Sequence, residues 1–415
     1  MQDGSLRSRL SQRDQNRRQP RQQPPQQQQQ QSTPVTHCLN DTLKAKYRPL
    51  LEQFSEKCLS LGINDMVQND VTSPVLQAIL KALKCQKSPM ADSACEKIMT
   101  ESQPFGAKDG DSLSIPPTWN QSAGFCRLVE ELLASSSKTR LKSIYKHHLK
   151  PRLQSLALSS SAPNFVLQRF LRSIRTPTLF ALVVEDVFRN MEFFVVKSSQ
   201  RAAIVAVAEK CIEFGTHQDE FVMALMRSLK CSTADTQRKL ALLVADFKTY
   251  DVLFGDESKG GQNNNNENNV VQVRVSLHGS LLLQRLFSFT SPDAVFNSFM
   301  SLPPSQLAAF ACDPSGCHVF DAILSSPSID DVKLNKFVSR MKSSLVTMAT
   351  SKCGSRVIDA LWKRSAVKNK IEVAEALTKQ LGRISGDRFG RFIARNLQLD
   401  SFALKKEQWV KNLQA

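Results

Sequence analysis

Residues 315–321 read Ser-Gly-Cys-His-Val-Phe-Asp, and residues 353–359 read Cys-Gly-Ser-Arg-Val-Ile-Asp. The same phrase occurs around Gly279 and, more loosely, around Gly390. The residues that follow the four glycines are 37, 38 and 36 positions apart. A fixed period of this size indicates stacked helical repeats, because each unit can bury its apolar face only against its neighbours. The sequence therefore predicts an all-α fold, an α-solenoid.

The composition favours an anionic partner. The chain has 415 residues and a formal net charge of +17, which suits a nucleic acid or a membrane surface, although a basic protein without such a ligand stays open. It contains no run of 18 apolar residues, so we expect no membrane span. The ten cysteines include no Cys-x-x-Cys pair, and no His/Cys cluster has ligand spacing. We therefore expect neither a metal nor a cofactor.

The chain divides into four predicted segments. Residues 1–34 form a Gln/Arg-rich arm that lacks the apolar residues needed to fold, and we expect it to be disordered. Residues 35–255 hold the N-terminal half of the repeat array, with an inserted loop at about 102–120. Residues 256–269 form an Asn-rich flexible loop, and residues 270–415 hold the C-terminal half of the array.

The phrase is degenerate in the middle of the chain. Asn164 occupies the first reading position of an earlier copy, and it lies 116 residues before Ser280. Because this distance is close to three periods, we expect two further repeats between them whose glycine phrase has been lost.

The side chains of each phrase suit contact with a base. Ser355 and Asp359 are four residues apart and therefore neighbours on one helix face, while Arg356 lies one step round the helix. Proteins commonly recognise single-stranded RNA by placing two polar groups at a base edge and a flat side chain between bases. The repeated phrase therefore favours an RNA-binding surface.

These phrases resemble the Puf (Pumilio-homology) repeats. The resemblance implies a right-handed, curved or C-shaped solenoid, in which the residue after Gly and the residue four later contact a base edge and the residue between them stacks. The RNA-binding residues that it implies are Cys126, Arg127 and Glu130 (a purine, with guanine favoured), Asn164, Phe165 and Gln168 (uracil), Ser280 and Gln284, Cys317, His318 and Asp321, Ser355, Arg356 and Asp359, and Arg391, Phe392 and Arg395.

Several of these sets depart from the family pattern. Asp321 and Asp359 stand where Puf repeats usually have Gln or Glu, and Leu281 is a poor stacking residue. Arg391 and Arg395 suit phosphates better than a base edge. A weaker copy of the phrase lies at residues 73–77.

Within this superfamily the chain most resembles the nucleolar branch, the group named nucleolar protein nine. The order and spacing of the phrases over residues 70–415, together with Thr216–Phe221, carry the likeness. The resemblance implies a nuclear and nucleolar protein that binds single-stranded or structured pre-rRNA near the 3′ end of the small-subunit rRNA and times its processing. It also implies pre-ribosomal particle proteins as partners. We expect a monomer without enzymatic activity.

Other interpretations stay open. A cytoplasmic Puf repressor of messenger RNAs would need Gln or Glu in most base-reading positions. An armadillo- or HEAT-like protein scaffold would explain the period, but not the recurring polar residues four positions apart. Residues 110–114 read Gly-Asp-Ser-Leu-Ser, the nucleophile block of a family of serine esterases. No apolar strand precedes this segment and no Asp-x-x-His follows in the C-terminal region, so we do not predict an enzyme.

Residues 138–152 are strongly basic, with six Lys or Arg, two His and no acidic residue. This stretch is either a phosphate-binding surface or a solvated helix face. The absence of interleaved carboxylates favours phosphate contact.

Overall fold

The computed structural model describes residues 41–102, 105, 115, 119, 122–158, 163–196, 200–255 and 272–414, and it contains no β-strand among them. The arm predicted at 1–34, the loop predicted at 256–269 and the Gly-Asp-Ser-Leu-Ser segment at 110–114 lie outside the described residues. Two compact units are present, Met1–Pro49 and Leu50–Ala415. The described part of the first unit is the start of helix α2 (Asp41–Leu59), and the repeats belong to the second.

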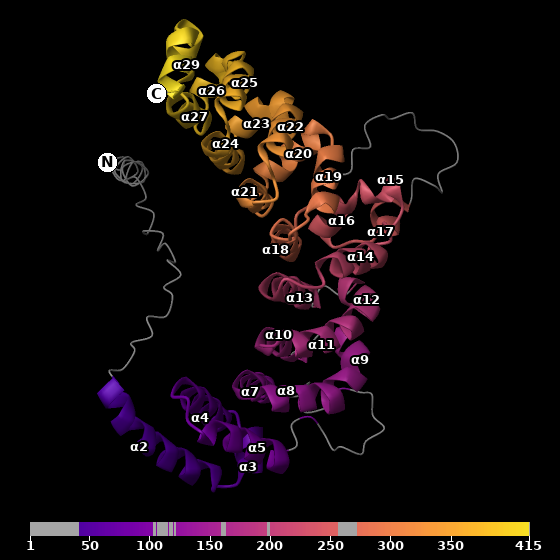
Figure 1. Cartoon of the computed structure of the whole chain (residues 1–415), viewed down its shortest axis with the longest axis vertical. Helices are drawn as coiled ribbons and strands as arrows, with labels where there is room; N and C mark the ends of the chain where they lie inside the picture. The colour runs from indigo at the N-terminus through magenta and orange to yellow at the C-terminus, as the bar shows by residue number, and fades with distance from the viewer. Residues whose placement is uncertain are drawn as a thin grey trace, which may run out of the picture. The chain divides into compact units, whose positions relative to one another are not determined.

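A row of helices, each in contact with the next, runs through the second unit (Figure 1). We call it the front row. Its members are α4 (Ser73–Cys85), α7 (Ala123–Ser135), α10 (Pro163–Ser173), α13 (Arg201–Phe214), α18 (Leu277–Leu286), α21 (Cys317–Ser325), α24 (Lys352–Arg364) and α27 (Gly390–Asn396). The phrases identified in the sequence lie on these helices. The predicted α-solenoid is therefore confirmed.

The remaining helices connect and support the front row. In the N-terminal part they are α3 (Ile63–Gln68), α5 (Met90–Ser102), α8 (Lys138–Ile144), the π-helix η1 (Tyr145–Leu149), the 3₁₀ helix η2 (Lys150–Arg152), α9 (Leu153–Leu158), α11 (Pro177–Arg189), α12 (Met191–Val196), α14 (Gln218–Ser228), α15 (Ala234–Gln237), α16 (Leu240–Asp246) and α17 (Tyr250–Phe254). In the C-terminal part they are α19 (Asp293–Ser301), α20 (Pro304–Cys312), α22 (Asp331–Met341), the 3₁₀ helix η5 (Lys342–Ser344), α23 (Leu345–Ala349), α25 (Val367–Thr378), α26 (Leu381–Gly386), α28 (Leu399–Leu404) and α29 (Lys406–Gln414).

The glycine of each phrase is required by a close approach of two backbones. A Cβ atom added to Gly354 would lie 2.5 Å from the carbonyl oxygen of Met348, in the short helix α23 that precedes α24. Gly279, Gly316 and Gly390 meet the preceding helices in the same way, against the carbonyls of Ala245, Phe310 and Ile384. The repeated glycine therefore marks the point where the front-row helix presses on the backbone before it.

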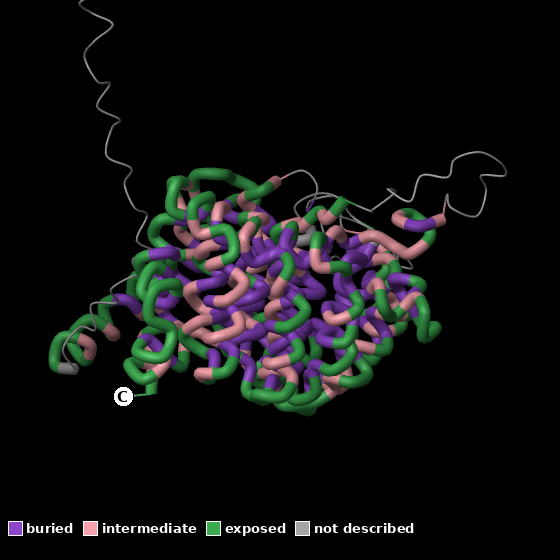
Figure 2. The backbone as a smooth tube through the Cα atoms, turned by 90° about the horizontal axis from the view of Figure 1, so that it is seen from above, coloured by how far each residue is buried: buried purple, intermediate pink, exposed green. Residues whose placement is uncertain are grey.

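The core continues from repeat to repeat. Figure 2 shows the buried residues inside the stack, with exposed residues around them. Phe299 of α19 illustrates the packing, because its ring centroid lies 5.1 Å from that of Phe310 and 6.4 Å from that of Phe320. Such aromatic contacts join helices of successive repeats and bury apolar area that one repeat could not bury alone.

The middle of the array is shorter than predicted. Between α10 and α18, the described front row contains α13, which contacts both helices. Our prediction of two repeats in this interval was wrong. Helix α16 packs on α18 and α19 and supplies the Ala245 carbonyl that Gly279 approaches, so it is the regular helix that precedes α18. The additional residues lie elsewhere between α13 and α18, where α15, α17 and the segment at 256–271 are found. The length of the interval therefore reflects insertions, which spacing alone does not distinguish from a lost repeat.

Candidate nucleic-acid interface

Hydrogen bonds at the helix starts orient the front row. The Oγ of Ser276 accepts from the backbone N–H of Gly279 at 3.1 Å, and Ser351 does the same for Gly354 at 3.4 Å. Asp387 Oδ1 accepts from the N–H groups of Phe389 and Gly390, both at 2.8 Å. These backbone donors, Gly390 first, lower the pKa of Asp387. Capping fixes where each helix begins, and so fixes the direction of the residues after Gly.

Flat side chains are exposed along the front row at the predicted stacking positions. Phe165 of α10 is 55% exposed and Phe392 of α27 is 45% exposed. Arg127 of α7, His318 of α21 and Arg356 of α24 are also exposed. Each comes from a different helix of the row, so each can offer its face to a separate base. Their contact with RNA stays a prediction, but their exposure satisfies its first requirement.

The hydroxyl of Ser280 is hydrogen-bonded within the protein. Ser280 is 2% exposed, and its Oγ donates to the carbonyl of Ser315 at 2.6 Å and accepts from Gln284 Nε2 at 3.0 Å. Ser73 and Gln77 of α4 make the equivalent bonds with each other and with the carbonyl of Gly124. These Ser/Gln pairs link successive repeats. Contact of Ser280 with a base edge stays a prediction, and it would require these hydrogen bonds to be exchanged. Gln284 is half-buried at the surface.

Cys126 and Cys317 are also withdrawn into the protein. Cys126 is 2% exposed and its Sγ donates to the carbonyl of Trp119 at 3.0 Å. Cys317 is 3% exposed and its Sγ donates to Pro314 at 3.3 Å. Burial, the largest cause, raises the pKa of each thiol to about 11. Both thiols are hydrogen-bonded to neighbouring backbone, and their contact with a base stays a prediction.

The contact between Cys126 and Trp119 was not predicted from the sequence. Trp119 belongs to the segment interpreted as an inserted loop, yet it is 1% exposed. Its ring lies edge-to-face on Phe105 with centroids 5.8 Å apart. The two aromatic residues in a Pro/Gly-rich stretch were the available signal that part of the insertion packs on the core.

The second predicted base-edge residue of each phrase, four positions after the first, varies in exposure. Gln168 is buried, and the side chain of Asn164 lies outside the described set. Glu130 is half-buried, and burial raises the pKa of its carboxyl against the opposing effects of Arg169 and Arg127. Asp321 Oδ2 lies 3.4 Å from His318 Nδ1.

Ser355 and Asp359 of α24 remain half-buried at the surface beside the exposed Arg356. Ser355 Oγ donates to the carbonyl of Lys352 within its own helix at 3.1 Å. It is therefore not tied to a neighbouring repeat in the way that Ser280 is. This set keeps the full predicted arrangement of one flat and two polar side chains at the surface.

The last front-row helix carries a cationic aromatic site. The guanidinium groups of Arg391 and Arg395 each lie 5.3 Å from the centroid of the Phe392 ring. Both arginines are exposed and line a pocket that Ser385, Gln398 and Asp400 also border. Two guanidinium groups beside one aromatic face can hold a phosphate next to a stacked base.

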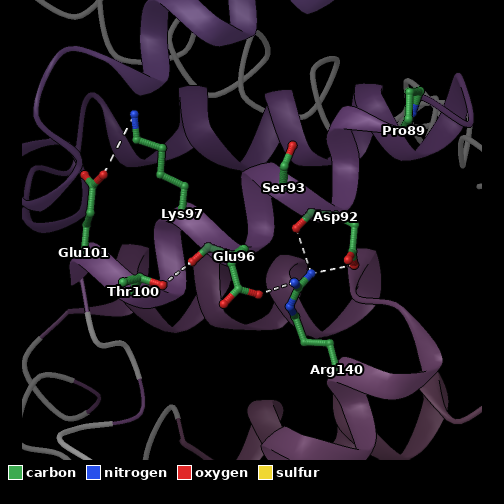
Figure 3. Close-up of a pocket in the computed structure, with 8 residues that line it drawn as sticks. All are labelled: Pro89, Asp92, Ser93, Glu96, Lys97, Thr100, Glu101 and Arg140. Carbon is green, nitrogen blue, oxygen red and sulfur yellow. Dashed lines mark hydrogen bonds and ion pairs between the residues drawn. The ribbon is translucent and has the colours of Figure 1, made fainter.

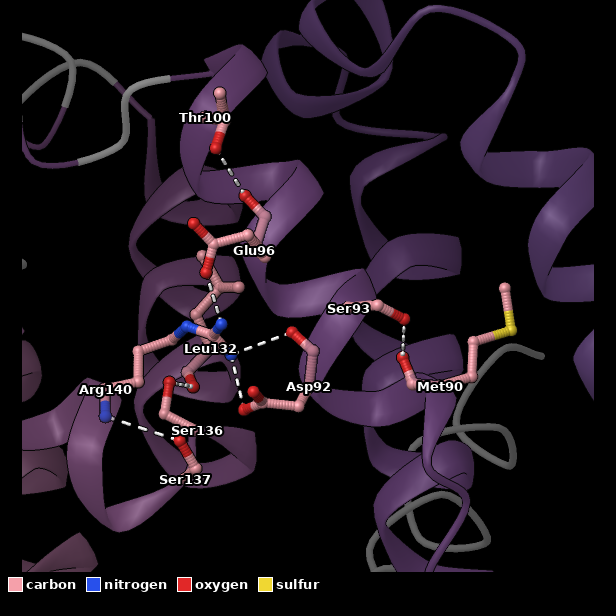
Figure 4. A network of polar contacts seen from close by, with 9 residues as sticks. All are labelled: Met90, Asp92, Ser93, Glu96, Thr100, Leu132, Ser136, Ser137 and Arg140. Atoms are coloured by element: carbon pink, nitrogen blue, oxygen red, sulfur yellow. Dashed lines mark hydrogen bonds and ion pairs between the residues drawn. The ribbon is translucent and has the colours of Figure 1, made fainter.

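The basic stretch at 138–152 is only partly available for phosphates. Arg140 of α8 contacts the carboxylates of Asp92 and Glu96 on α5, where these side chains line an open pocket (Figure 3). It also donates to the backbone carbonyl of Asp92 at 2.8 Å, and Ser137 caps its helix by accepting from the Arg140 N–H (Figure 4).

Two further basic side chains of residues 138–152 are paired or buried within the protein. Lys150 lies 2.9 Å from Asp186, and Arg152 is buried. Lys138, Lys142 and Lys146 remain exposed. Arg140 and Lys150 thus connect helices within the stack, and the other three lysines of the stretch remain exposed for phosphates.

The described residues contain no group of three or more His, Cys, Asp or Glu side chains placed to hold a metal ion. Among the same residues, no helix is both long and apolar enough to cross a bilayer.

A family model described as the NOP9-like PUF repeat domain matches residues 1–392. The chain belongs to this family. This PUF-repeat chain is 29% identical to nucleolar protein 9 of Mus musculus over 359 residues, which cover 85% of the chain and 55% of that relative. It therefore spans about half the length of this relative. The family resemblance inferred from the phrases is confirmed.

Solved structures support the same fold. APUM23-GGAGUUGACGG superposes with a TM-score of 0.65 at 19% identity, covering 86% of this chain and 66% of that one. The Puf4 RNA binding domain bound to the HO endonuclease RNA 3′ UTR recognition sequence gives a TM-score of 0.51 at 15% identity, covering 85% of this chain and 91% of that one. At these identities the likeness establishes the repeat fold.

Proposed function

We propose that the chain binds RNA along the front row, mainly by stacking bases on its flat side chains and by contacting phosphates. One observation carries this proposal: Arg127, Phe165, His318, Arg356 and Phe392 are exposed at equivalent positions on successive or nearby front-row helices. Stacking a base on an aromatic side chain contributes about 1–3 kcal/mol and tolerates any base. The net charge of +17 favours the phosphate contacts.

Sequence selectivity is modest in this proposal. Ser280, Cys126 and Cys317 use their polar atoms within the protein, so these repeats offer fewer donors and acceptors to a base edge. Selectivity then depends on the half-buried Glu130, Asp321 and Asp359. A protein with few base-edge contacts obtains most of its affinity from terms that do not depend on sequence.

The RNA that we propose is pre-rRNA, single-stranded or structured, near the 3′ end of the small-subunit rRNA. Membership of the NOP9-like PUF repeat family supports this choice, together with the name of the mouse relative, nucleolar protein 9. Binding there would time the processing of the precursor without catalysis by this chain. We further propose a nucleolar location, pre-ribosomal particle proteins as partners, and a monomeric state.

Crosslinking of the chain to RNA in cells, followed by sequencing, tests the assignment. We expect crosslinks concentrated in small-subunit pre-rRNA, and fewer in a variant with Phe165→Ala and Phe392→Ala. Crosslinks concentrated in messenger RNAs would favour a Puf-type repressor instead. A normal set of protein partners without RNA crosslinks would favour a protein scaffold.

A further inference from the structure

Helix α13 differs from the other front-row helices at the position where a base would stack. Counting one 38-residue period from Phe165 leads to Ala203, and aligning the C-terminal ends of α10 and α13 leads to Ala206. Both alanines are buried, as are all residues from 203 to 208. Under either alignment, the stacking position of α13 holds no flat side chain. The one aromatic residue of this helix, Phe214, packs on Phe180 of α11 with ring centroids 5.4 Å apart.

Two carboxylates lie in the second half of α13, the half-buried Glu209 and the exposed Glu213, while Arg201 at the helix start is half-buried and donates to the carbonyl of Phe247. Glu209 Oε1 lies 3.1 Å from Arg285 Nη2 of α18, and Glu209 Oε2 lies 3.9 Å from Arg172 Nε of α10. One carboxylate therefore holds arginines from both neighbouring front-row helices. One turn further along, the exposed Glu213 pairs with Lys210, which is itself buried and also donates to the carbonyl of Ile174. A phosphate passing over α13 meets two carboxylates.

Helix α18 also lacks an exposed flat side chain at its stacking position. Its stacking position holds Leu281, which is half-buried, and the hydroxyl of Ser280 is tied to Ser315. The next exposed flat side chain after Phe165 is therefore His318 on α21, three helices along the described front row. Packed helices lie about 8–10 Å apart, so these two side chains are separated by roughly 24–30 Å along the row.

We propose that the front row binds RNA in two blocks, separated by a spacer formed by α13 and α18 that neither stacks nor reads a base. The N-terminal block presents Arg127 and Phe165, and the C-terminal block presents His318, Arg356 and Phe392. Glu209 is a positioning residue in this arrangement. It withholds Arg172 and Arg285 from the RNA and so weakens binding across the spacer. This inference rests on the proposed RNA-binding function.

Abasic RNAs test the spacer without altering the protein. Three eight-nucleotide probes, one nucleotide for each front-row helix, carry the same phosphates: octauridine, one with the two central bases removed, and one with the second and third bases removed. We expect the centrally abasic RNA to bind within about twofold of octauridine. With its eight nucleotides on the eight front-row helices, the off-centre RNA loses two stacking contacts in either strand polarity, and should bind at least about tenfold more weakly.

Equal losses for the two abasic RNAs, or a larger loss for the central one, would overturn the spacer. Failure of the proposed function has a different signature. In that case octauridine would not bind, or its affinity would not change when Phe165 and Phe392 are replaced by alanine in a folded variant.

Glu209→Gln tests the positioning residue, with Glu213→Gln as its matched control. Both substitutions remove one negative charge from the same helix, but only the first releases two arginines. If both arginines reach phosphates, the log–log salt slope should steepen by up to about 1.4, because each phosphate neutralised on a single strand contributes about 0.7. We expect octauridine to bind more tightly to Glu209→Gln than to Glu213→Gln. Equal affinities, or weaker binding by Glu209→Gln, would contradict this role.

Discussion

Replacing Gly354 by alanine tests why the glycine phrase repeats. The new Cβ would lie 2.5 Å from the Met348 carbonyl oxygen, 2.8 Å from its Cα and 3.0 Å from its carbonyl carbon. All three are backbone atoms, so no side chain can rotate away and α23 or α24 must move. Overpacking of this kind costs about 1–3 kcal/mol. The gain from replacing glycine in a helix is about 0.5–1 kcal/mol, so we expect a net loss of up to about 2.5 kcal/mol.

Gly382→Ala is the matched control. Gly382 lies in α26, and a Cβ added there would meet no atom within 4 Å. The same chemical change should therefore stabilise the protein by about 0.4–1 kcal/mol. Urea unfolding monitored by circular dichroism measures both variants, with the change read from the midpoint at constant slope. If Gly354→Ala were as stable as Gly382→Ala, the close approach would not explain the glycine.

Two further predictions concern the polar contacts that orient the front row. Ser280→Ala should destabilise the fold by about 1–3 kcal/mol, because the Ser315 carbonyl and the Gln284 amide lose their partner. The base selectivity of RNA binding should stay the same. A changed preference among RNA homopolymers would show that Ser280 contacts RNA after all. Asp387→Asn should flatten the acid limb of the stability–pH curve. Backbone N–H donors lower the pKa of Asp387 in the folded state. The carboxylate therefore contributes fully to folding stability above its unfolded pKa near 4, and this contribution is lost as pH falls through its folded-state pKa. Urea midpoints of Asp387→Asn measured from pH 2 to 6 that match those of the parent would contradict this prediction.

The repeat architecture was predictable because a local rule produces it. Each copy needs a residue without Cβ where its helix meets the preceding backbone, and Gly354 or Gly316 therefore recurs at the period of the fold. The stacking residues follow from the same register, one position after the residue that follows glycine. Exposure of Phe165 and Phe392 agrees with that expectation.

The base-edge residues were less predictable because their availability depends on distant segments. Cys126 is buried by Trp119 from an insertion, and Ser280 donates to the next repeat. Neither partner belongs to the phrase. The period also failed between α13 and α18, where insertions lengthened the chain without adding a front-row helix. Local patterns give the position of a side chain on its helix, but the packing of neighbouring repeats decides whether a ligand can reach it.

The affinity of the chain for a single-stranded RNA from the 3′ end of small-subunit pre-rRNA, measured against salt, tests the central claim most directly. Phe165→Ala with Phe392→Ala removes two stacking surfaces and no charge, so binding should weaken by about 2–6 kcal/mol while the salt slope stays the same. Arg391→Gln with Arg395→Gln should instead reduce the slope by up to about 1.4. Unchanged affinity in the folded double phenylalanine variant, or a parent affinity indifferent to salt, would contradict RNA binding by stacking and phosphate contact along the front row.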